Sequence, residues 1–286
     1  MKRGIPVFLF ACTVALAQQY VAWTVAGSGQ PFTPVAAVNA SIAPGGIATD
    51  AGGNVYIRGF QCVLKVDPRG ILTLVAGNGR AGSPQDGIPA TSAHLSGSGA
   101  IAIDPTGRNI YTVDPSIRVR KISVNGTITT VAGNGTVGSS GDGGPATSAQ
   151  FSEIQSLAAD GAGNFYVTDA SGTNRVRRVS ANGIVTTVAG NGTAGFSGDG
   201  GPATSASLFG PWSVAVDGAG GIYIGGQDNR VRKVSTAGVM TTVAGTGTYG
   251  ISGDGGPAMA AALTDNRQIA ADMCGFPPVR APGTYP

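Results

Sequence analysis

Apolar residues in this chain recur in short runs of four to six positions, and glycine or asparagine bounds each run. The runs are rich in Val, Ile, Thr and Tyr, which favour extended backbone. No repeating segment offers the sustained 3.6-residue periodicity of a helix. The pattern therefore predicts an all-β protein of short strands joined by tight turns. One stretch shows four predicted strands in order: Leu157–Asp160, Asn164–Asp169, Asn174–Val179 and Ile184–Ala189.

The same four runs repeat along the chain at a nearly constant spacing. The string Val-Ala-Gly ends the fourth run at 25–27, 75–77, 131–133, 188–190 and 243–245, at spacings of 50, 56, 57 and 55 residues. The first run reads apolar-Ala-x-Asp in each repeat. Four short strands in a repeat of this length are typical of β-propeller blades. The predicted units cover about 47–77, 101–133, 157–190 and 214–245, with a partial fifth unit at 263–272.

The repeated strings resemble those of NHL-repeat β-propellers, and more narrowly the bacterial secreted and teneurin-like versions whose blades are joined by a long Gly-rich connector. The strings that carry the resemblance are Asn164–Asp169, Asn174–Val179, Val188–Gly192 and Ser197–Ala203. The resemblance covers roughly residues 22–272, within a predicted propeller domain at 18–272. It implies a propeller that serves as an interaction platform, although some relatives are lyases or lactonases.

The two ends of the repeat array are incomplete. Trp23–Gly27 is a copy of the fourth strand without the first three, and Ile269–Asp272 is a copy of the first strand without recognisable successors. The tail at 273–286 loses the pattern and contains four prolines, which cannot donate to a sheet ladder. We expect four blades plus a partial fifth in an incomplete or truncated ring, the tail being a truncation or frameshift product of a longer six-bladed ancestor. Open blades would permit edge-to-edge self-association.

The N-terminus is typical of a secretory signal peptide. Lys2 and Arg3 precede an apolar run, and Ala15-Leu16-Ala17 supplies a cleavage site, so residues 1–17 should be removed after Ala17. We expect a secreted or periplasmic protein without a membrane span, because the apolar run is shorter than the roughly 20 residues that cross a bilayer. Losing the two basic residues lowers the formal net charge from +3 to +1. That charge gives no electrostatic argument for a nucleic-acid partner.

A Gly/Asp connector recurs between units, at 84–93, 140–149, 197–206 and 252–261. A phosphate cradle would need a following helix and usually a Lys, which are missing. Weak cation loops at Asp142, Asp199 and Asp254 remain an alternative, although each copy offers a single carboxylate. We favour a packed connector between blades, in which Asp142 and Asp199 accept hydrogen bonds from nearby backbone. A short helical turn should follow Pro145 and Pro202, and the next apolar residue should plug it onto a blade. These plugs are Leu95, Phe151, Leu208 and Leu263.

Basic strings recur in the third predicted strands. They supply the candidate ligand-binding residues Arg118, Arg120, Arg175, Arg177, Arg230 and Arg232. One interpretation is a basic ring for an acidic glycan or an acidic protein partner. The other is that these arginines pair with the first-strand residues Asp104, Asp160 and Asp217, which the near-zero net charge favours. The first unit departs from the pattern, because Cys62 stands at an Arg position.

Candidate catalytic chemistry is sparse. The chain has a lone histidine, His94, on which any nucleophile–His–acid arrangement would depend, and Glu153 is the one Glu. We expect no catalytic residue, no metal site and no cofactor. The sequence thus favours a secreted binding or scaffold module for a protein or glycan at the cell envelope. The alternatives are a hydrolase or lyase of the six-bladed, lactonase-like kind, or a truncated fragment without function.

Overall fold

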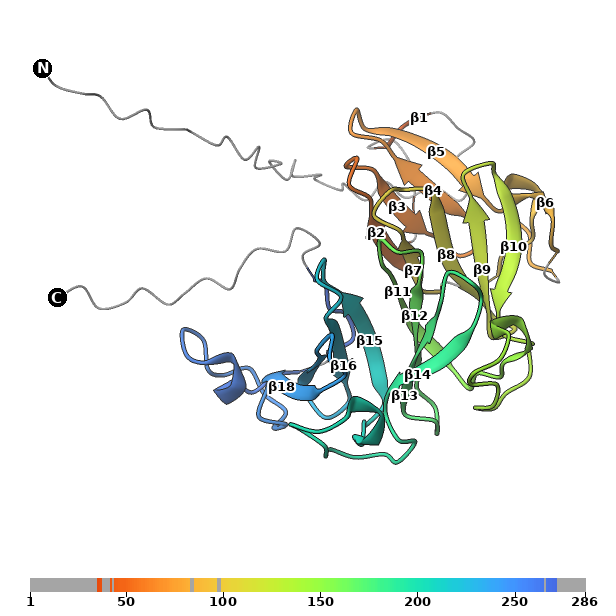
Figure 1. The fold of residues 1–286 in the computed structure, drawn as a ribbon. Coiled ribbons are helices and arrows are strands. Elements are labelled where there is room, and N and C mark those ends of the chain that lie inside the picture. Colours follow the sequence, from red (N-terminus) through yellow and green to blue (C-terminus); the bar gives the residue numbers. More distant parts are fainter. Residues whose placement is uncertain are drawn as a thin grey trace, which may run out of the picture.

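The computed structural model describes residues 35–37, 42, 44–82, 85–96, 99–264 and 266–271. These residues form four antiparallel sheets that follow one another along the chain (Figure 1). The predicted signal peptide, the strand copy at Trp23–Gly27, Asp272 and the tail at 273–286 lie outside the described residues. The all-β fold class with four propeller blades is confirmed.

Each blade is a meander of four strands whose chain order is also its spatial order. Blade 1 comprises β2 (Gly46–Thr49), β3 (Val55–Arg58), β4 (Val63–Val66) and β5 (Ile71–Ala76). Blade 2 comprises β7 (Ile101–Ile103), β8 (Asn109–Asp114), β9 (Arg118–Ser123) and β10 (Thr127–Ala132). Blade 3 comprises β11 (Ile154–Ala159), β12 (Phe165–Asp169), β13 (Arg175–Val179) and β14 (Val185–Ala189). Blade 4 comprises β15 (Pro211–Val216), β16 (Ile222–Gly226), β17 (Val231–Val234) and β18 (Met240–Ala244).

The first strands of the blades lie innermost and pack against one another. β2 contacts β7, β7 contacts β11, and β11 contacts β15. Among the described residues, β2 and β15 make no comparable contact with each other. The four blades therefore occupy an arc around a common centre, running from blade 1 in orange to blade 4 in blue (Figure 1).

The recurring Val-Ala-Gly string ends each fourth strand at a point of close backbone approach. Gly190 has a φ of 91°, and a Cβ there would lie 2.1 Å from the carbonyl oxygen of Asn174. Gly133 repeats this geometry against the carbonyl oxygen of Ile117. Glycine is required because any side chain would be strained and would collide with the neighbouring backbone.

Each of the first three connectors crosses to the following blade and lies along its outermost strand. The connector of blade 1 forms β6 (Ile88–Pro89), which pairs with β10. Pro145 and Pro202 make the equivalent bridges to Ile184 and Val239. Upstream of blade 1, β1 (Val35–Ala36) pairs with β5 in the same position. The expected helical turns follow as the 3₁₀ helices η2 (Ala90–Ser92), η3 (Ala146–Ser148), η4 (Ala203–Ser205) and η5 (Ala258–Ala260).

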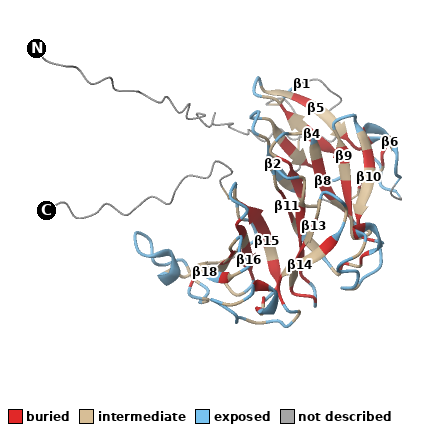
Figure 2. Ribbon diagram, in the orientation of Figure 1, coloured by how far each residue is buried: buried red, intermediate tan, exposed pale blue. Residues whose placement is uncertain are grey.

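The cores lie between adjacent blades, where buried residues follow the inner parts of the strands (Figure 2). The apolar plugs Leu95, Phe151 and Leu208 are buried as expected, whereas Leu263 is half-buried. Beyond β18, the chain makes isolated bridges between Tyr249 and Leu263 and between Ser252 and Ala262. The predicted first-strand copy forms no strand among the described residues 266–271. No helix among the described residues is long and apolar enough to cross a membrane.

Candidate functional site

The second arginine of each basic string is buried and bonded to a connector. Arg177 is fully buried on β13, and its Nε and Nη2 donate to Asp142 Oδ1 at 3.0 and 2.7 Å. Arg232 contacts Asp199 at 2.5 Å, and Arg120 contacts Asp86 at 2.8 Å. The predicted pairing of these arginines with Asp104, Asp160 and Asp217 is therefore wrong. The nearest carboxylate comes instead from the connector that enters the blade, and the second-strand residues Asp114 and Asp169 lie 3.5 and 4.0 Å from Arg120 and Arg177.

The first-strand aspartates close their own hairpins. Asp160 accepts hydrogen bonds from the backbone of Ala162 and Asn164 and from the side chains of Asn164 and Tyr166. Burial and the nearby Asp160 charge raise the pKa of Tyr166 to about 12. Lys233, rather than an arginine, pairs with Asp217. These carboxylates are occupied by local donors, which explains why they do not reach the buried arginines.

A threonine on the fourth strand completes the contact with the connector. Thr187 donates its backbone N–H to Asp142 Oδ2 at 3.0 Å, and its hydroxyl donates to the same oxygen. Burial alone would raise the pKa of Asp142, but the bonds from Thr187 and Arg177 outweigh it and lower the pKa below its usual value. We call this arrangement the Asp–Arg–Thr clasp. Its three copies are Asp86–Arg120–Thr130, Asp142–Arg177–Thr187 and Asp199–Arg232–Thr242.

Contrary to the sequence prediction, the connector aspartates do not bond to nearby backbone. Asp142 and Asp199 bind side chains and backbone of the next blade that lie 33 to 45 residues further along the chain, rather than the backbone just ahead of them. Both oxygens of each carboxylate accept from protein donors. Cation binding at Asp142, Asp199 and Asp254 stays a prediction. Within the described ranges, no group of three or more His, Cys, Asp or Glu side chains could hold a metal ion.

Blade 1 lacks the clasp and is filled differently. Leu64 and Leu74 occupy the positions of the clasp arginine and threonine, and Cys62 is buried beside Leu64 in an apolar cluster. Arg58 on β3 is fully buried and donates to Thr112 and to the carbonyl oxygens of Gly59, Cys62 and Ser96. Burial lowers the pKa of Arg58 to about 10. Sequence analysis missed this residue, which stands where the Asn-x-Tyr strings of blades 2 and 3 have Val113 and Thr168.

The first arginine of each string lies nearer to solvent. Arg118, Arg175 and Arg230 stand at or just before the start of the third strand, so they occupy the same end of three successive blades. Their guanidinium groups donate to the carbonyl oxygens of Asn134, Asn191 and Thr246. We call these three residues the arginine row. The guanidinium of Arg230 also lies 3.9 Å from the ring centre of Phe196, a contact that the sequence analysis did not anticipate.

The two arginines of a string therefore have different environments. Within the described part of the chain, no carboxylate lies within ion-pair distance of Arg118 or Arg175, and Arg230 approaches Asp228 at 3.9 Å. Arg120, Arg177 and Arg232 are buried and paired. The candidate ring of six arginines thus separates into three structural residues and three that keep their charge near the surface. His94, the lone histidine, is half-buried beside Gly82.

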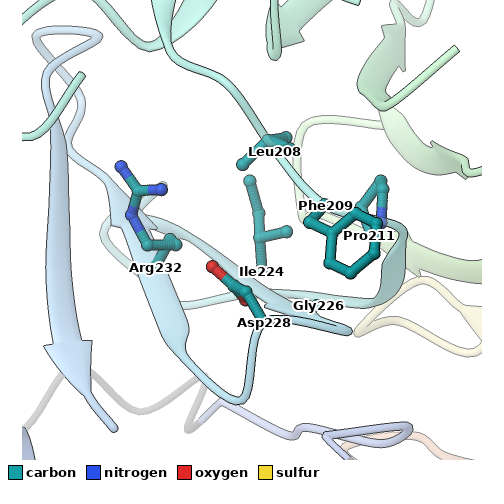
Figure 3. A pocket seen from close by; sticks show the side chains of 7 residues that line it. All are labelled: Leu208, Phe209, Pro211, Ile224, Gly226, Asp228 and Arg232. Carbon is teal, nitrogen blue, oxygen red and sulfur yellow. The ribbon is translucent and has the colours of Figure 1, made fainter. Parts of the chain in front are cut away.

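A small hollow adjoins the clasp of blade 4 (Figure 3). Arg232 and Asp228 line one part of it, and Phe209 and Pro211 line another. It is far smaller than the roughly 300–1,000 Å³ of most ligand pockets. Burial raises the pKa of Asp228, opposed by the charges of Arg230 and Arg232. The hollow is too small to define a substrate.

Comparisons with known proteins point to the same repeats. No protein-family model matches the chain. The chain is 26% identical to human teneurin-1 over 226 residues, covering 67% of the chain and 8% of teneurin-1. It thus spans less than a tenth of the length of the curated relatives that it matches.

Two solved structures from Bacteroides thetaiotaomicron are also similar. A protein of unknown function has a TM-score of 0.49 and 19% identity, covering 84% of this chain and 67% of that chain. An auxiliary nutrient binding protein has a TM-score of 0.48 and 22% identity, covering 66% of this chain and 46% of that chain.

Proposed function

Because the chain is an NHL-type β-propeller, we propose that it is an exported binding or scaffold module that recognises an acidic protein or glycan at the cell envelope. The arginine row carries this proposal. Arg118, Arg175 and Arg230 repeat at one end of blades 2, 3 and 4, each anchored by a carbonyl oxygen. Among the described residues, Arg118 and Arg175 have no carboxylate within ion-pair distance and Arg230 has Asp228 at 3.9 Å, whereas the clasp arginines are paired inside the protein.

A row of cations at repeat spacing suits an extended or multivalent anion. Each contact between exposed charges contributes little, because water and salt screen it. Several contacts to one chain add up through high effective concentration. We therefore expect binding that depends on the whole row and weakens steeply with ionic strength.

The module is non-catalytic in this proposal. Its buried arginines and connector aspartates stabilise the junctions between blades, which leaves them no part in a reaction. Export rests on the signal peptide at residues 1–17. N-terminal sequencing of the protein recovered outside the cytoplasm should find Gln18 first; an intact N-terminus at Met1 would contradict export by this route.

Binding can be tested on arrays of acidic glycans and acidic proteins, with heparin and polygalacturonate as probes. The triple variant Arg118→Gln, Arg175→Gln, Arg230→Gln should lose at least tenfold in affinity. A matched triple variant, Arg69→Gln, Arg80→Gln, Arg108→Gln, removes the same charge from exposed positions elsewhere. It should keep most of the affinity at physiological salt. Equal losses in the two triple variants would contradict recognition by the arginine row, and so would unchanged binding in the first.

A further inference from the structure

The last connector is built like the others but touches no following blade among the described residues. We call residues Ser252–Ala261, which include η5, the terminal clasp. In the preceding connectors, the backbone pairs with the next outer strand at fixed positions. Gly143 N–H donates to Val185 at 2.8 Å, and Ala146 N–H donates to Gly183 at 2.8 Å. In the described part of the chain, Gly255 and Ala258 have no such backbone acceptor.

The terminal clasp nevertheless has the same backbone conformation as the connectors that contact a following blade. Gly253 and Gly255 have φ values of 101° and 77°, matching the 102° and 81° of Gly141 and Gly143. Ala261 N–H closes the turn by donating to the carbonyl oxygen of Ala258. Gly245, which follows β18, donates its N–H to the same oxygen at 2.9 Å. A site that already holds its binding conformation loses less entropy when a ligand arrives.

At Ala258 the terminal clasp exposes a position that the preceding connectors bury. Ala146 and Ala203 are at most 2% exposed, whereas the equivalent Ala258 is exposed. Ile251 is 91% exposed, and Tyr249 and Met259 also lie open to solvent. Apolar residues beside backbone donors that have no partner among the described residues are typical of a protein-binding edge.

The three filled clasps define the ligand chemistry. In each of them, the connector Asp bonds to a Thr on the outermost strand of the following blade and to an Arg on the strand beside it. The segment before blade 1 has no Asp between residues 28 and 49. Blade 1 correspondingly has Leu64 in place of the Arg and Leu74 in place of the Thr. In the four described blades, the three residue types therefore occur together or not at all. Asp254 is present, so its counterpart should carry the Arg and the Thr.

We infer that the terminal clasp binds the outer edge of a β-hairpin presented by a partner protein, with Thr on the edge strand and Arg on its neighbour. A second copy of this chain fits poorly, because its four outer strands are covered by β1, β6 and the bridges at Pro145 and Pro202. Residues 20–27 of the chain itself contain Thr24 in the right register, but no Arg-Val-Arg string precedes them. Main-chain pairing would supply affinity, and Asp254 would supply selectivity.

A hairpin copied from blade 3 is the direct probe. The peptide Asn174–Gly190 contains every group that the filled connector at Asp142 binds. Fluorescence anisotropy of the labelled peptide should show saturable binding to the full chain. Asp254→Ala should weaken binding at least tenfold, as should Arg177→Gln with Thr187→Val in the peptide. The matched variant Glu153→Gln, at an exposed acidic position, should leave binding unchanged.

Several results would overturn the inference. Because an isolated hairpin is marginally stable in water, a peptide cyclised through its ends is measured in parallel, and failure of both forms to bind would sink the proposal. Unchanged peptide affinity in the Asp254→Ala variant would also contradict the proposal. Tighter peptide binding after Thr24→Val would show that the chain's own N-terminal strand occupies the clasp. The arginine row takes no part in this test, so its outcome is independent of the proposed anion recognition.

Discussion

Arg177 and Asp142 join blade 3 to the connector that leaves blade 2, through two hydrogen bonds to one carboxylate oxygen. The guanidinium is fully buried, while 44% of the aspartate side chain remains exposed. Arg177 also donates to the carbonyl oxygens of Gln150 at 2.7 Å and Ser140 at 3.1 Å. One side chain thus fixes both ends of the connector to the blade that follows it.

Replacing Arg177 by Met should destabilise the protein by about 3 kcal/mol, because a polar network loses its donor while packing volume is kept. The exposed part of Asp142 reduces the cost, since water can solvate the released carboxylate. Urea unfolding followed by circular dichroism measures the change. A loss below about 1 kcal/mol would show that the connector is held mainly by its apolar plug.

Thr187→Val should cost about 1 kcal/mol, because the methyl group cannot replace the hydroxyl donor to Asp142. Thr186→Val on the same strand is the matched control and should stay within about 0.5 kcal/mol of the parent. Combining Thr187→Val with Asp142→Ala should cost less than the sum of the single changes, because both remove one interaction. Strict additivity would place Thr187 outside the clasp.

Acid should weaken the clasp in a defined direction. Hydrogen bonds lower the pKa of Asp142 and Asp199 in the folded state despite the opposing effect of burial. A lowered folded pKa stabilises the protein above the unfolded value of about 4, and this contribution disappears as pH falls through the folded value. The stability difference between the parent and Asp142→Asn should therefore shrink below about pH 4. A constant difference between the parent and Asp142→Asn across this pH range would contradict the account.

The apolar plug should matter as much as the clasp. Phe151 is fully buried between blades and lies 4.9 Å from the guanidinium carbon of Arg177. Phe151→Ala should cost roughly 3–5 kcal/mol. Leu263 is the same plug on the terminal clasp and is half-buried, so Leu263→Ala should cost less than about 1.5 kcal/mol. Thermal and urea unfolding of the two variants compare them directly, and equal losses would mean that the terminal connector is packed like the others.

Sequence periodicity predicted the strands and the connectors because each depends on local patterns. Alternating Val, Ile and Thr bounded by glycine specifies a short strand whatever lies opposite it. The turn after Pro145 likewise follows from its own residues. These features were found in the structure within a few positions of the predicted ranges.

Periodicity could not choose the partner of the buried arginines. Asp160 and Asp142 both recur in step with Arg177, so either set satisfies the repeat. The choice depends on which loop lies against which blade, and this is a tertiary relationship. The one sequence signal was the joint loss of the connector Asp, Arg and Thr around blade 1, where Leu64 and Leu74 stand. Arg58 was missed because it is a single arginine outside the recurring basic strings.

The most direct test of the clasp compares four substitutions of one kind. Asp86→Ala, Asp142→Ala and Asp199→Ala each remove a carboxylate bonded to a buried arginine, and each should lower the free energy of unfolding by about 2 kcal/mol after allowance for solvent screening. Asp254→Ala removes the same group from the terminal clasp and should change it by less than about 0.5 kcal/mol. An equal loss of unfolding free energy in all four variants would contradict the account, and so would no loss in any of them.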